Sequence, residues 1–221
     1  MRALRCLGVA LVALAVVVPA FAGDIVSMPT GNIVAPNHWE FNYIYWNFDF
    51  PPGAPAFASV FENFVGITDW LEVDNITIDL DRFGTFSEFN AYAVPFAETP
   101  SHPGLIVGAT NLTSAKWLPG EDDSISPFVL SSYNILVPKG KPPSLFDPVV
   151  RLHAAYGWNY HGDYWFGGGQ VLVSPRLGVA AFEYRHAPSY LAAYRYNQKL
   201  ELRAGWAAGD PFLSFGTFTE W

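Results

Sequence analysis

The stretch that decides the fold is VVRLHAAYGWNY, Val149–Tyr160. Every second residue from Val150 to Tyr160 is apolar or aromatic, and the residues between them include Arg151 and His153. A period of two places successive side chains on opposite faces of an extended strand, whereas a helix would mix the two sets. The segment therefore predicts a β-strand with one apolar face and one polar face.

The same alternation recurs along the rest of the chain and predicts twelve strands in all. Lys199–Ala208 repeats it clearly, with leucines, alanine and tryptophan on one face and charged residues on the other. The other predicted strands are His38–Phe50, Phe57–Ile67, Trp70–Leu80, Phe86–Phe96, Gly104–Leu112, Pro127–Val137, Asp163–Val173, Leu177–Arg185, Tyr190–Tyr196 and Phe212–Trp221. Ten strands is the alternative count, because strand boundaries are the least certain part of such an assignment.

Composition indicates what the apolar faces contact. Of 221 residues, 51% are hydrophobic, 17% are aromatic and 14% are charged, against about 25% charged in an average soluble domain. So many strands would fill more of the chain than a globular domain allows, but a membrane barrel requires them. We therefore predict an all-β fold, a closed antiparallel up-and-down transmembrane β-barrel. A net charge of −8 argues against nucleic acid as a partner.

The first 22 residues have the pattern of a secretory signal peptide. Two arginines precede the apolar run Leu7–Val18, and Ala20-Phe21-Ala22 supplies small residues at the expected cleavage site. Cleavage there leaves residues 23–221 as one barrel domain. An uncleaved anchor is the alternative, although the apolar run is short for a span of about 20 residues. The single cysteine, Cys6, lies in this segment, which leaves no disulfide or zinc cluster downstream.

The connections between strands divide into two predicted rims. Ile67–Glu72, Ser174–Leu177 and Asn197–Glu201 are short and rich in turn-forming residues, and the strand count places all three on one rim, which we assign to the periplasm. The longest polar connection, Thr113–Ser126, falls on the opposite rim. Pro138–Pro148 is longer than a periplasmic turn is expected to be. An even strand number puts both chain ends on the periplasmic side.

Tryptophans provide a separate test, because indole rings prefer the interface between lipid headgroups and hydrocarbon. Seven of the eight tryptophans fall near predicted strand ends, and Trp117 falls in the long loop. The predicted membrane-girdle residues are Trp39, Trp46, Trp70, Trp158, Trp165, Trp206 and Trp221. The alternative is that these rings fill the core of a β-sandwich.

Four motifs and the chain end resemble bacterial outer-membrane β-barrel proteins of the porin-like kind. The motifs are Pro29–Asn32, Trp39–Tyr43, Gly66–Glu72 and Leu200–Trp206, and the last residue is the aromatic Trp221. The resemblance implies the barrel fold, a bacterial outer-membrane location reached by a cleaved signal peptide, and contact with outer-membrane lipid. It also implies that the barrel-assembly machinery recognises the C-terminal strand that ends in Trp221. It implies no particular substrate.

Alternation also predicts which polar side chains face the lumen. The lumen-lining candidates are Glu72, Asp74, Asp79, Glu88, Asn90, Arg151, His153, Glu183, Arg185, Arg195, Lys199, Glu201 and Arg203. Between Gly23 and Thr110 the chain has one basic residue against eleven acidic ones, whereas the remainder has nine of each. Opposed acidic and basic walls would orient and filter small polar solutes in a porin-like pore.

Two other functions remain open at this stage. Inward charges that pair with one another would give a closed structural barrel without conduction. A soluble secreted β-sandwich that binds carbohydrate would also explain strands, acidity and export. We expect no enzyme, because the mature chain lacks a Gly-x-Ser-x-Gly nucleophile motif for a lipid hydrolase or deacylase. We also expect no cofactor and no metal, since Asp79, Asp81 and the acidic run 121–123 form no complete calcium-binding loop.

Overall fold

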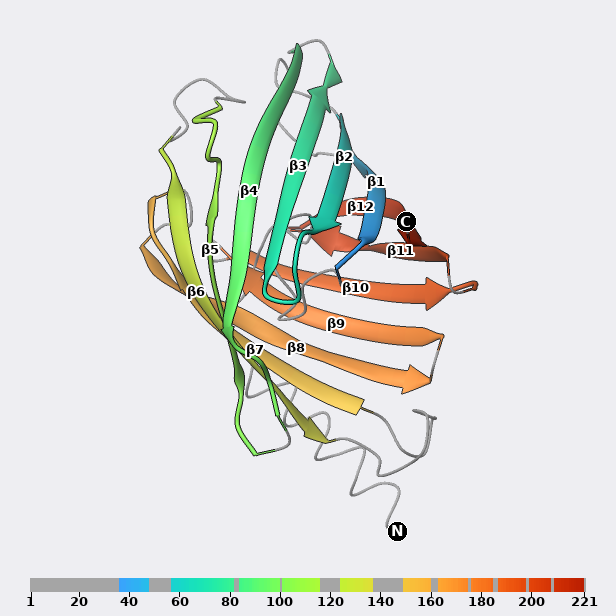
Figure 1. The fold of residues 1–221 in the computed structure, drawn as a ribbon. Coiled ribbons are helices and arrows are strands. Elements are labelled where there is room, and N and C mark those ends of the chain that lie inside the picture. The colour runs from blue at the N-terminus through green and yellow to red at the C-terminus, as the bar shows by residue number, and fades with distance from the viewer. Residues whose placement is uncertain are drawn as a thin grey trace.

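The computed structural model describes residues 36–47, 57–81, 84–99, 101–115, 124–136, 149–159, 163–174, 176–184, 187–197, 199–207 and 209–220. Twelve antiparallel strands form a closed barrel in which β1 pairs with β12 (Figure 1). The strands are β1 (His38–Asn47), β2 (Phe57–Gly66), β3 (Leu71–Leu80), β4 (Gly84–Phe96), β5 (Gly104–Thr110), β6 (Ser126–Leu136), β7 (Val149–Gly157), β8 (Tyr164–Ser174), β9 (Leu177–Tyr184), β10 (Ala187–Arg195), β11 (Leu200–Ala207) and β12 (Asp210–Glu220). All twelve predicted strands are confirmed, whereas the predicted signal peptide and Trp221 lie outside the described residues.

The barrel has two different rims. His38 at the start of β1 pairs with Glu220 at the end of β12, so both ends of the wall lie at one rim, here called the termini rim. The connections from β2 to β3, β8 to β9 and β10 to β11 lie at this rim, as predicted. The connection from β5 to β6 lies at the opposite rim, here called the loop rim. Within the described ranges, no helix is long and apolar enough to cross a membrane.

Side chains from two sets of strands, which cross one another at a steep angle, fill the interior of the barrel. In Figure 1, β2 to β5 run steeply up the view while β8 to β11 run across it. Two buried apolar clusters lie in the interior, the first toward the loop rim and the second along β4 to β8. One consists of Ile44, Ala58, Val60, Ile76, Ile78, Leu80, Ala207 and Phe212. The other consists of Tyr92, Ile106, Phe128, Leu130, Ala155 and Phe166.

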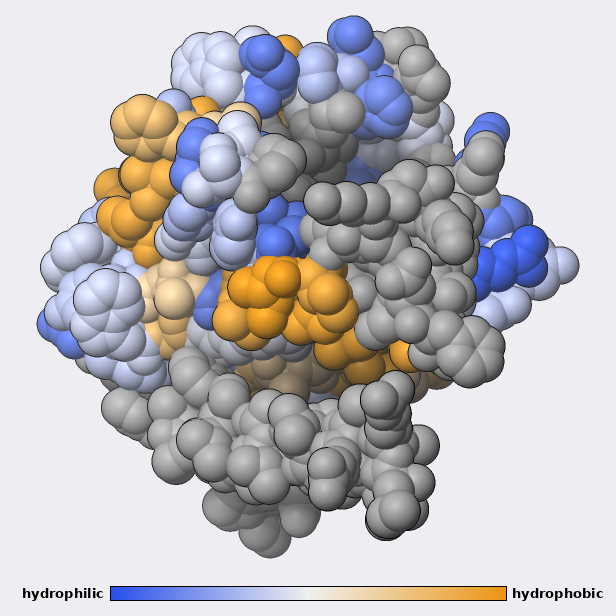
Figure 2. Space-filling model, turned by 90° about the horizontal axis from the view of Figure 1, so that it is seen from below, coloured by the Kyte–Doolittle hydropathy of each residue, from blue (hydrophilic) through white to orange (hydrophobic). Residues whose placement is uncertain are grey.

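The outer surface of the barrel is largely apolar. Alternate residues of most strands expose aliphatic or aromatic side chains, and on the face seen from below these form patches beside hydrophilic areas (Figure 2). Exposed residues of this kind are Phe61, Val107, Val129, Leu152, Trp165, Val179, Tyr190, Leu202, Trp206, Leu213 and Phe215. Apolar patches of this extent on a protein surface mark contact with a membrane or another protein.

One part of the outer surface is polar instead. Toward the loop rim, the outer face of β3 and β4 carries Thr77, Asp79, Thr85 and Ser87, here called the outer polar strip. The Thr77 and Ser87 hydroxyls are 2.9 Å apart, and the Thr85 hydroxyl donates to Asp79 Oδ1 at 3.2 Å. The tip of this hairpin therefore has its polar face outside and its apolar face inside.

Candidate functional site: the polar half of the interior

Polar side chains fill the half of the interior nearer the termini rim. Six of the residues singled out by alternation are buried there, with no more than 7% exposure each. They are Glu72, Asp74, Glu88, Asn90, Arg151 and His153. Buried polar groups are costly unless they are hydrogen-bonded, so their partners decide what this region can do.

The first polar cluster joins β3 and β4. Asn90 Nδ2 donates to Asp74 Oδ1 at 2.7 Å, and the Tyr92 hydroxyl donates to Asp74 Oδ2 at 2.6 Å. Asn90 also donates to Glu88 at 3.3 Å, while its Oδ1 accepts the backbone N–H of Asn111 at 2.7 Å. Both carboxylate oxygens of Asp74 are thus held by neutral donors, and the start of the β5–β6 connection is fixed to the inner wall.

The second polar cluster joins the end of β4 to β6 and β7. Arg151 forms a 2.6 Å ion pair with Glu98 Oε2 and donates to Ser132 Oγ at 3.0 Å. The other oxygen of Glu98 accepts the backbone N–H of Asn134 at 2.8 Å. Glu98 lies beyond the register shift near the end of β4. A residue in that position has no alternation pattern, so sequence analysis missed it.

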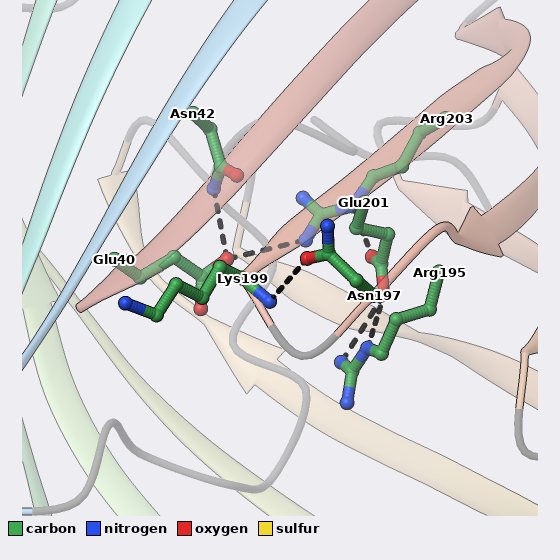
Figure 3. Close-up of polar contacts among 7 residues, drawn as sticks. All are labelled: Glu40, Asn42, Arg195, Asn197, Lys199, Glu201 and Arg203. Atoms are coloured by element: carbon green, nitrogen blue, oxygen red, sulfur yellow. Dashed lines mark hydrogen bonds and ion pairs between the residues drawn. The ribbon is translucent and has the colours of Figure 1, made fainter. Parts of the chain in front are cut away.

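The third polar cluster crosses the seam where the barrel closes (Figure 3). Arg203 on β11 forms ion pairs with Glu40 on β1 at 3.1 Å and with Glu201 at 2.8 Å. Arg195 on β10 pairs with the other oxygen of Glu201 at 3.2 Å. Asn42 donates to Glu40 at 3.1 Å. These contacts link β1, β10 and β11 across the intervening β12.

A glycine makes room for that crossing. Gly216 on β12 pairs with Asn42 on one side and with Glu201 on the other. A Cβ atom at Gly216 would lie 2.3 Å from Asn42 Oδ1 and 3.7 Å from an Arg203 nitrogen. The missing side chain lets Arg203 reach Glu40 over the strand between them.

Several predicted lumen residues lie elsewhere. Asp79 was wrongly assigned, because the odd-numbered residues of β3 face outward and it belongs to the outer polar strip. The register of β9 places Glu183 opposite Gly167 and gives Phe182 the position facing His153, with its ring 6.1 Å from that of His153, yet the Glu183 side chain is buried at 5% exposure. Lys199 is exposed in the β10–β11 turn, where its N–H donates to Asn197 Oδ1 at 2.7 Å (Figure 3). Arg185 lies outside the described residues.

The predicted tryptophan girdle contains one residue that points the other way. Trp46 shares the inward face of β1 with Ile44 and packs against its apolar cluster, so its assignment to the girdle was wrong. Trp70, Trp158, Trp165 and Trp206 are exposed, and Trp39 lies half-buried on the outer face of β1. Trp221 lies outside the described residues.

Carboxylates outnumber cations among the described inward side chains. The inward basic groups are Arg151, Arg195 and Arg203, and all three take part in ion pairs. The inward carboxylates include Glu40, Glu62, Glu72, Asp74, Glu88, Glu98 and Glu201. Glu40 lies two residues from Asn42 on the same face of β1, and Glu62 on β2 pairs with Asn42. Alternation in the sequence could therefore have identified both as inward residues. Within the described ranges, no three potential metal ligands are grouped so as to hold an ion.

No protein-family model matches this chain, and no curated protein does. Among solved structures it is similar to KdgM porin, with 8% sequence identity and a TM-score of 0.53, covering 82% of this chain and 99% of that one. It also aligns with an outer membrane channel from Pseudomonas putida F1 at 12% identity and a TM-score of 0.42, over 87% of this chain and 100% of that one. The likeness to KdgM porin concerns the fold: this chain is a closed, twelve-stranded, porin-like β-barrel.

Proposed function

We propose that this protein is an outer-membrane barrel that passes or binds small polar solutes through its charged lumen. The observation that carries the proposal is the distribution of side chains around a closed wall, with apolar groups outside and charged groups inside at the termini rim. A polar interior inside an apolar band is the arrangement of water-filled outer-membrane barrels. Nothing in this arrangement calls for catalysis, and we propose that the protein acts without it.

A second candidate function is a closed structural barrel. It is favoured by the two apolar clusters of the interior, whose residues are at most 6% exposed. Apolar packing of this kind resists the entry of water.

Planar-bilayer recording distinguishes the two candidates. We expect the purified barrel to conduct, and its reversal potential in a salt gradient to show a preference for cations, because inward carboxylates outnumber inward arginines. The preference should fall when Glu62 is replaced by Gln, since that removes one inward negative charge. Asp69→Asn, an exposed change in the β2–β3 turn, is the control. A folded barrel that never conducts would reject the pore and leave the structural function.

Arginine substitutions on the outer face test the membrane location. Leu202→Arg should destabilise the barrel in lipid by about 2–4 kcal/mol, because this residue lies mid-strand on the apolar surface. Ser87→Arg on the outer polar strip should cost about 1 kcal/mol or less. Urea unfolding in lipid vesicles measures both, and the wild type should appear in the outer-membrane fraction. Equal losses for the two variants would contradict a bilayer around this surface.

A further inference from the structure

His153 is the one fully buried histidine among the described residues, and neither of its ring nitrogens has a hydrogen-bond partner there. The side chain is 4% exposed. A neutral imidazole always carries one donor and one acceptor, so burying both without partners costs stability. The ring nevertheless sits in the polar half, where the other buried groups described above are bonded.

The surroundings of His153 do not favour a positive charge. On its own strand, Arg151 lies two residues away on the same inner face. Arg151 is the charged neighbour, and the nearby carboxylate, Glu98, is already bound to it.

Among the described residues, those that follow the register to His153 from the neighbouring strands include no ionisable group. The cross-strand residues follow the register from β6 through β8, β9 and β10, and they are small, polar or aromatic. They are Ser132, Gly168, Phe182 and Ser189.

We propose that His153 is a proton-operated lock on the polar half of the lumen, a reading that rests on the proposed function. While the ring is neutral, it packs against Phe182 and the interior stays in its less conducting form. A proton taken from solution onto the free ring nitrogen creates a second cation beside Arg151. The imidazolium needs water or a carboxylate, and it competes with Arg151 for Glu98. Loosening that ion pair also frees Ser132 and Asn134, which Arg151 and Glu98 hold.

The test compares conductance in neutral and acidic solution. We expect conductance of the full mature barrel to rise roughly tenfold between about pH 7.5 and about pH 3.5, a range over which a buried imidazole becomes charged. His153→Gln stays neutral throughout and should lack the rise. His102→Gln, which changes an exposed histidine in the β4–β5 connection, should keep it. A rise that survives in His153→Gln overturns the proposal.

A second measurement covers a barrel that does not conduct at any pH, an outcome that rejects the proposed pore. The mature sequence has no cysteine, so a single cysteine at Leu130 reports on the interior. Leu130 is fully buried on the same face of β6 as Ser132. Its labelling by a water-soluble thiol reagent, relative to Thr113→Cys in the exposed loop, should increase in acid. The increase should vanish with His153→Gln, and equal labelling at both pH values overturns the lock.

Discussion

Replacing Gly205 with alanine should prevent the barrel from folding stably. A Cβ atom there would lie 1.9 Å from the carbonyl oxygen of Tyr190 and 2.9 Å from Leu191 Cα. Both atoms belong to the backbone of β10, which pairs with β11 through Leu191 and Gly205. Side chains can turn away from a clash, but a paired strand moves only by losing its hydrogen bonds. We expect a loss of more than about 3 kcal/mol in unfolding free energy.

The measurement is the fraction of protein that gives a heat-modifiable band, followed by urea unfolding in lipid. Gly178→Ala is the matched control, because its added Cβ would lie 3.4 Å from the nearest atom, a Leu172 methyl group. That variant should fold like the wild type. If Gly205→Ala folds equally well, β10 and β11 are farther apart than described here.

Removing Arg151 should have the second-largest effect. Arg151→Leu leaves Glu98 charged and largely buried, without the guanidinium that it contacts at 2.6 Å. Removing one partner of a buried ion pair typically lowers the free energy of unfolding by about 3–5 kcal/mol, because the remaining charge is left uncompensated. Combining Arg151→Leu with Glu98→Gln should recover part of that loss, since the second change removes the stranded charge.

Urea unfolding of the two single variants and the double variant gives the coupling energy. Arg195→Leu is the control, because Arg195 is 49% exposed and its pair with Glu201 is screened by water. That change should cost less than about 1 kcal/mol. Additive losses at Arg151 and Glu98 would show that their contact contributes nothing to stability.

Strand count and rim assignment were predictable because alternation is a local property of the chain. Each strand from β1 to β12 carries its own period of two, and an even count places the ends together. The tight turns gave a second local signal at the same rim. Contacts between residues far apart in the sequence were not needed to predict the strand count or the two rims.

The inward apolar clusters were not predictable by the same argument. In β3, Leu71 and Val73 face outward, whereas Ile76 and Ile78 face inward. The apolar set changes face halfway along the strand, because one end meets the surroundings of the barrel and the other meets the opposite wall. Asp79 was misassigned for this reason, since its polarity indicated an inward position that the alternation of β3 excludes.

The polar clusters depend on partners that are far apart in sequence. Arg203 and Glu40 are separated by 163 positions, and only barrel closure across Gly216 brings them together. Glu98 reaches Arg151 after an irregular end of β4. Alternation identifies which side chains face inward but says nothing about which of them meet.

The buried apolar clusters make any hydration of this interior depend on temperature. Bringing water to Ile76, Leu130 and their neighbours raises the heat capacity, as exposure of hydrocarbon surface does in general. The free energy of hydrating the interior then varies with temperature along a curve instead of a straight line. Since the hydrophobic contribution weakens on cooling, chilled membranes should hold more of the hydrated form than warm ones.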